Sequence, residues 1–167
     1  MVDVFSVLMV SKKQEIKSKL RVDISRSLIT VSITIFIFIL TFKPEILKGS
    51  FLLPVQITFS IPLFLTSMFA RMRLAYKERP KIWETYEYIS FVLGYFLLLN
   101  SLGILLSLRI NLTIGMMFFA INILISLIYS SILIRENKAK LKSRIIKDSF
   151  FIIITLFGGI LPSLSLY

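Results

Sequence analysis

Cysteine and histidine are both absent from this chain of 167 residues. Their absence excludes disulfides, thiolate nucleophiles, haem ligation by imidazole and the commonest zinc and copper sites. Glycine-rich phosphate loops, HExxH elements and serine-based triads are missing as well. We therefore predict no catalytic, cofactor-binding or metal-binding residues, and a protein that is not an enzyme.

Charged residues are also scarce. They make up 17% of the chain, whereas soluble domains carry about 25%. Hydrophobic residues make up 56% and fall in uninterrupted blocks rather than in an amphipathic period. The polar groups are too few to cover a globule in water, so lipid is the medium that these blocks require.

Five of the apolar blocks are long enough to cross a bilayer, which takes about 20 residues in a helix. They are residues 24–42, 51–70, 88–108, 112–134 and 150–167. All five lack acidic residues, and Arg26 is the only cation within them, close enough to one end to reach the headgroups. The sequence therefore predicts an all-α, polytopic transmembrane helical bundle with five spans over residues 24–167.

Residues 1–23 precede the first span and mix apolar residues with lysines. We expect this stretch to lie in the cytoplasm. Its pattern fits an amphipathic interfacial helix resting on anionic headgroups, and it fits a plain cytoplasmic extension equally well.

The fifth block is short and contains Gly158, Gly159 and Pro162, which loosen or kink a helix. An alternative to a fifth span is therefore a four-span bundle followed by a re-entrant or interfacial C-terminal helix. These three residues are candidate hinges, together with Pro54 and Pro62 of the second block. Each proline of the second block is expected to leave one backbone carbonyl without its partner.

The cations are sorted to one side of the predicted membrane. Of the 20, only Lys43, Lys48 and Arg109 fall in the loops after the first and third blocks. The positive-inside rule places the N-terminus and the basic loops in the cytoplasm of a multi-pass cell-membrane protein, with the C-terminus outside if there are five spans. We interpret the net charge of +11 as topological rather than as a sign of nucleic-acid binding. Candidate contacts with anionic lipid or an acidic partner are Lys12, Lys13, Lys17, Arg71, Arg73, Lys138, Lys140, Lys142 and Arg144.

Two acids stand at the cytoplasmic start of the third block, Glu84 and Glu87, close to two cations. We expect them to form surface salt bridges, each worth less than about 1 kcal/mol. The neighbouring Trp83 and Tyr86 are typical of an aromatic belt at the membrane interface.

Asparagines at matching depth mark the third and fourth blocks. Asn100 and Asn122 lie eleven residues before and after Asn111, so the two reach a similar height in a hairpin. We expect their amides to pair, which contributes about 0.6 to 2 kcal/mol to helix association. The alternative is that the two asparagines line a path for an ion or solute.

Other polar residues repeat at helical spacing and form stripes along the spans. The candidates for a polar path or for helix packing are Asn100, Asn122, Ser126, Ser130, Gln56, Ser60, Thr30 and Thr34. Closely packed membrane helices use small and hydroxyl residues at their contacts, so the first interpretation is the interior of the bundle. The second is a hydrated lumen within one chain or between subunits.

Together these features favour a homo-oligomeric or complex-embedded bundle that conducts, or helps to transport, an ion or a small solute. The alternative is a non-catalytic scaffold or accessory subunit that anchors partners through its basic cytoplasmic face.

Overall fold

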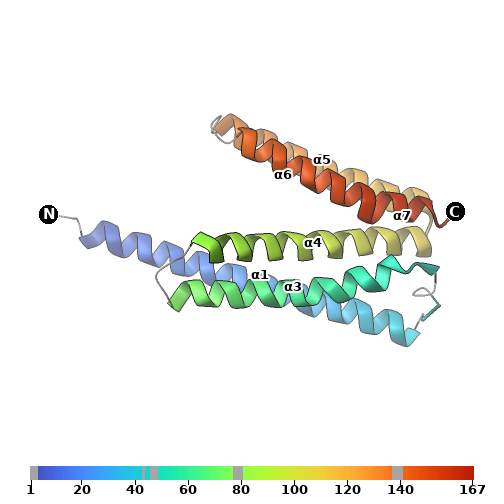
Figure 1. Cartoon of the computed structure of the whole chain (residues 1–167), viewed down its shortest axis with the longest axis horizontal. Helices are drawn as coiled ribbons and strands as arrows, with labels where there is room; N and C mark the ends of the chain where they lie inside the picture. The colour runs from blue at the N-terminus through green and yellow to red at the C-terminus, as the bar shows by residue number, and fades with distance from the viewer. Residues whose placement is uncertain (1–3, 43, 46–48, 77–80, 137–140) are drawn as a thin grey trace. The chain divides into compact units, whose positions relative to one another are not determined.

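The computed structural model describes residues 4–42, 44–45, 49–76, 81–136 and 141–167, without the side chains of residues 4–18, 75, 76, 81 and 143 (Figure 1). All regular elements within these ranges are helical. They are α1 (Val4–Phe42), α3 (Leu52–Tyr76), α4 (Lys81–Arg109), α5 (Leu112–Glu136), α6 (Leu141–Thr155), the π-helical turn η2 (Leu156–Ile160) and α7 (Leu161–Leu164).

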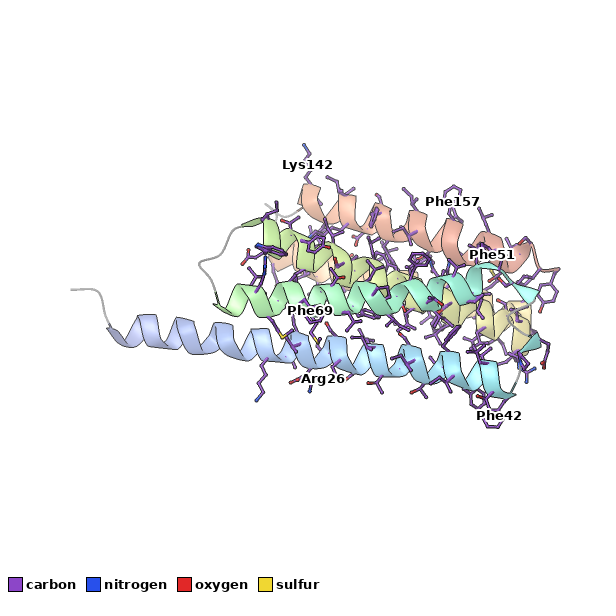
Figure 2. The ribbon with its side chains drawn as sticks, turned by 60° about the horizontal axis from the view of Figure 1, so that its bottom comes forward. Arg26, Phe42, Phe51, Phe69, Lys142 and Phe157 are labelled. Carbon is purple, nitrogen blue, oxygen red and sulfur yellow. The ribbon has the colours of Figure 1, made fainter. Side chains whose placement is uncertain are left out.

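Five stretches of helix are long and apolar enough to span a membrane. They are Lys19–Phe42, Leu52–Leu74, Ile82–Arg109, Leu112–Glu136 and Arg144–Leu164. The all-α fold class and the presence of five helices that are long and apolar enough to span a membrane are therefore confirmed. Large apolar side chains point outward from them, among them Phe42, Phe51, Phe69 and Phe157, each more than half exposed (Figure 2). Lipid is the solvent that such a surface fits.

The first span continues a longer helix, and the last span contains an irregular turn. Residues from Val4 onward belong to the same continuous helix as the first span. The last span runs through α6, η2 and α7 without reversing, because the backbone around Gly158, Gly159 and Pro162 absorbs its irregularity in one π-helical turn.

The chain forms two compact units, one of residues 1–35 and 58–95 and the other of residues 36–57 and 96–167. In the first unit, α1 and α3 meet at two fully buried serines, where the Ser60 hydroxyl donates to the Ser32 hydroxyl over 3.4 Å. The same part of α3 packs against α4 at Gly94, where an added Cβ atom would lie 3.1 Å from the ring of Phe64. Small residues thus set these helix contacts.

In the second unit, α4, α5 and the last span meet through glycines. Gly103 of α4 faces the ring of Phe119 of α5, which is 1% exposed, and Gly115 of α5 faces Ser107 of α4. The helices α5 and α6 lie side by side (Figure 1). Residues 151, 155, 159 and 163 of the last span are buried at intervals of four, so one stripe of this helix faces its neighbours.

We expect Gly103→Ala to destabilise the second unit, because the added methyl group would overlap the ring of Phe119. Overpacking of this kind costs about 1 to 3 kcal/mol. Gly49→Ala is the control, since among the described residues its methyl group would meet Leu108 at 3.5 Å, an ordinary van der Waals contact. Thermal unfolding in detergent measures both, and equal stability of the two variants would contradict the close contact.

Candidate functional site: a buried polar centre at a π-helical turn

Two buried amides reach the backbone of the last span. The Gln56 Nε2 atom of α3 donates to the Gly158 carbonyl over 2.6 Å, and the Asn100 Nδ2 atom of α4 donates to the Ile154 carbonyl over 3.1 Å. Gln56 is 4% exposed and Asn100 is 1% exposed. All of these residues belong to the second unit.

Pro162 explains why the Gly158 carbonyl needs a donor from elsewhere. In a regular helix that carbonyl would accept from the amide of residue 162, which proline lacks. The backbone instead forms a π turn, in which the Leu161 amide donates to the Leu156 carbonyl. The amide of Gln56 takes the place of the missing donor. In lipid no water is present to do so.

Gly158 and Gly159 allow the two amides to come this close. A Cβ atom on Gly158 would lie 2.6 Å from Asn100 Nδ2 and 3.4 Å from Gln56 Nε2. A Cβ atom on Gly159 would lie 2.9 Å from Asn100 Oδ1. Any larger residue at either position would push the amides away from the carbonyls that they serve.

Three buried side-chain oxygens around this turn have no hydrogen-bond partner within the described residues: Gln56 Oε1, Thr155 Oγ1 and Ser163 Oγ. Thr155 is 1% exposed and Ser163 is 0% exposed. Leaving a buried polar group unpaired costs about 1 to 3 kcal/mol. We call the following residues the polar centre: Gln56, Asn100, Thr155, Gly158, Gly159 and Ser163.

The polar centre is made of neutral groups. Its side chains carry amides and hydroxyls, and the described part of the chain holds no group of three or more histidines, cysteines or acids that would bind a metal. Such oxygens are the ligands by which membrane proteins replace the hydration shell of a monovalent ion. Divalent cations are usually bound through carboxylates, which the polar centre lacks.

The predicted pairing of Asn100 with Asn122 is wrong. Asn122 Nδ2 donates over 2.8 Å to the Phe118 carbonyl of its own helix, while Asn100 is bonded to the last span. Equal depth in a hairpin does not decide which helix Asn100 faces, and in the structure it donates to a backbone carbonyl of the last span.

The remaining serine candidates of α5 and α3 differ in burial and in the helix that they contact. Ser126 is half-buried, whereas Ser130 is buried and donates to Asp148 Oδ1 of α6 over 2.7 Å. Ser60 is buried at the contact with α1.

For Thr30 and Thr34, the expected place in the bundle interior is wrong, because both are exposed in α1. The helix instead buries Ser25, Ser32 and Ile39, which are spaced by seven residues. The Thr30 hydroxyl is satisfied by the Arg26 carbonyl of its own helix, so it needs no neighbour.

The two prolines of α3 have different roles. Pro54 is the third residue of the helix, where the amide has no intrahelical partner in any case, so its expected effect on a carbonyl is wrong. Pro62 does lie inside the helix. The Pro62 carbonyl accepts a bond from the Thr66 hydroxyl over 2.7 Å.

One of the two acids of the first unit, Glu87, departs from expectation, whereas Glu84 is exposed. Glu87 does not lie at the surface: it is 2% exposed, and both of its oxygens accept from Arg21 Nη1 of α1, at 2.9 and 2.8 Å. Sequence analysis missed this pair because 66 residues separate its members and no local pattern joins them.

The basic candidates are described in part. Arg73 lies over the Trp83 ring at 4.9 Å and Arg144 over the Tyr129 ring at 5.3 Å, both as cation–π contacts. Lys142 is exposed (Figure 2), and Arg71 is half-buried. Lys138, Lys140 and the side chains of Lys12, Lys13 and Lys17 lie outside the described residues.

No protein-family model, curated protein or solved structure matches the chain. The polar centre therefore has to be interpreted from its own chemistry.

We expect Asn100→Leu to lower the stability of the protein by about 1 to 2 kcal/mol, since a carbonyl of the last span loses its donor. Asn122→Leu is the matched control. Its amide serves only its own helix, so we expect less than about half that effect. Thermal unfolding in detergent or nanodiscs compares the two, and a larger loss for Asn122→Leu would refute the assignment.

Proposed function

We propose that this small multi-pass membrane protein is a channel-like or transport-type component without enzymatic activity, and that the polar centre binds the species that crosses. The observation that carries the proposal is the set of three unpartnered oxygens, all buried beside one π-helical turn. π turns are frequent at functional sites.

A purely structural role accounts for only part of the polar centre. The two amide nitrogens repair the backbone of the last span, and that task is complete without Thr155 and Ser163. Buried polar groups that serve only packing normally have partners. Two hydroxyls and one amide oxygen that lack partners within the described residues favour a site with an occupant.

The chemistry of the oxygens favours a monovalent cation as that occupant. A cation is stabilised by each oxygen lone pair that is not used in a hydrogen bond, and neutral oxygens bind it weakly enough for release. Acidic residues at this depth would hold it more tightly, and the polar centre has none.

The second unit also has a groove that reaches the π-helical turn, although no residue of the polar centre lines it. It has a volume of about 460 Å³. Its lining includes Phe51 of the loop before α3, Phe157 and, after η2, Pro162. Phe157 lies within η2 itself. A solute in this groove would therefore be in contact with the turn that carries Gly158.

We further propose that several copies associate in the cell membrane, with the N-terminus in the cytoplasm. Helix α5 buries only Gly115, Phe119 and Ser130 in the single chain, so most of its apolar surface is available to lipid or to another copy. A scaffold or accessory role for the basic face has no comparable support among the described residues.

The test is cation flux into liposomes that contain the purified protein. We expect sodium or potassium flux from the unaltered protein, and a fall of about tenfold or more in the double variant Thr155→Val, Ser163→Ala. This variant removes both hydroxyls that have no partner within the described residues. Ser131→Ala is the control, because its hydroxyl is exposed and bonded to the Leu127 carbonyl.

Two results would overturn the proposal. The first is absence of flux under both sodium and potassium gradients in vesicles shown to contain folded protein. The second is equal flux from the double variant and the Ser131→Ala control.

A further inference from the structure

A second polar site lies in the first unit, apart from the polar centre. It is a cavity of about 540 Å³. Its lining residues are Leu20, Arg21, Arg71, Glu84, Glu87 and Tyr88. They come from the ends of three candidate membrane spans, which places the cavity where those spans leave the apolar region. That is the depth of lipid headgroups.

One wall of the cavity is the Arg21–Glu87 ion pair. Arg21 donates to both Glu87 oxygens through the same nitrogen, Nη1, so its Nη2 and Nε atoms take no part in this pair. The Arg21 side chain is 49% exposed and the Glu87 side chain is 3% exposed. Glu87 therefore fixes the Arg21 guanidinium at the cavity while leaving it donors for a ligand.

Arg71 also lines the cavity. Arg71 Nε is buried and forms no hydrogen bond in the described part of the chain. Arginine stays charged under all ordinary conditions, so its desolvated donor has to be met by an acceptor. Two guanidiniums facing one cavity are the arrangement that recognises a phosphate.

The acids of the cavity restrict which phosphate fits. Its lining includes two arginines and the two carboxylates of Glu84 and Glu87, so the four charges balance. A headgroup that carries only negative charge would be repelled by the carboxylates. A headgroup with a phosphate and a nearby ammonium would satisfy both signs, since the ammonium is attracted to the acids and the phosphate to the arginines.

We propose that this cavity binds a phosphoethanolamine group, supplied by the headgroup of an aminophospholipid. The phosphate lies against Arg71 and Arg21, and the ammonium lies towards Glu84. The proposal is independent of cation transport, because the cavity and the polar centre belong to different units and share no residue.

The experiment is a lipid titration of the full chain in detergent, followed by native mass spectrometry. The probes are phosphatidylethanolamine, phosphatidylglycerol and phosphatidylcholine with identical acyl chains. We expect phosphatidylethanolamine to bind about tenfold more tightly than the other two. Phosphatidylglycerol lacks the ammonium, and phosphatidylcholine lacks its hydrogen-bond donors.

Arg71→Gln tests the phosphate contact, and we expect it to weaken phosphatidylethanolamine binding by about tenfold. Arg26→Gln is the matched control, since Arg26 is an exposed arginine of the same unit that does not line the cavity (Figure 2). Circular dichroism confirms folding of both variants. Glu84→Gln should reduce the preference for phosphatidylethanolamine over phosphatidylglycerol.

The phosphoethanolamine group could come from a lipid headgroup or from a soluble compound. A measurement on the unaltered protein separates these two sources and does not depend on any variant. Soluble glycerophosphoethanolamine should displace the lipid only at much higher concentration, because it lacks the acyl chains. Equal affinity for the soluble compound would overturn the lipid source. Equal or tighter binding of phosphatidylglycerol, or equal effects of Arg71→Gln and Arg26→Gln, would overturn the site.

Discussion

A backbone carbonyl that loses its amide partner inside a bilayer finds no water to donate a hydrogen bond, so another group of the protein has to donate it. This requirement determines the packing of the second unit. Pro162 removes one helical donor, and the chain supplies a replacement from Gln56 of another helix. The donating amide has to come close to the backbone, and glycine at positions 158 and 159 leaves the space for this approach. The position of the last span against α3 and α4 is thus tied to the defect in its own backbone.

The sequence was sufficient for the five spans because the length of an apolar run is a property of one stretch of chain. The sequence was insufficient to predict which face of each helix is buried. Thr30 bonds to the carbonyl four residues before it, so a hydroxyl facing lipid costs little, and the spacing of hydroxyls does not show which side is buried. The buried side of α1, marked by Ser25 and Ser32, depends on what α3 presents to it.

Contacts between distant residues were the hardest part to predict. The depth of Asn100 followed from counting residues, but its partner depended on the backbone of a helix more than 50 residues away, at Ile154. The sequence around Glu87 does not indicate that this residue is buried, because its partner Arg21 lies far away in the chain, on α1. Single-sequence reasoning locates polar groups along a helix, whereas the choice of partner is made by packing.

The two amides of the polar centre also determine its electrical character. A carbonyl only accepts hydrogen bonds, so the side of each amide that meets Gly158 or Ile154 has to be its nitrogen. The amide oxygens of Gln56 and Asn100 are left to accept from other groups, and Gln56 Oε1 has no hydrogen-bond partner within the described residues. Repairing the backbone with amide donors leaves a surplus of acceptors, and a surplus of acceptors in a medium without water attracts a positive charge and repels a negative one. The defect introduced by Pro162 and the cation binding that we propose would therefore have the same origin.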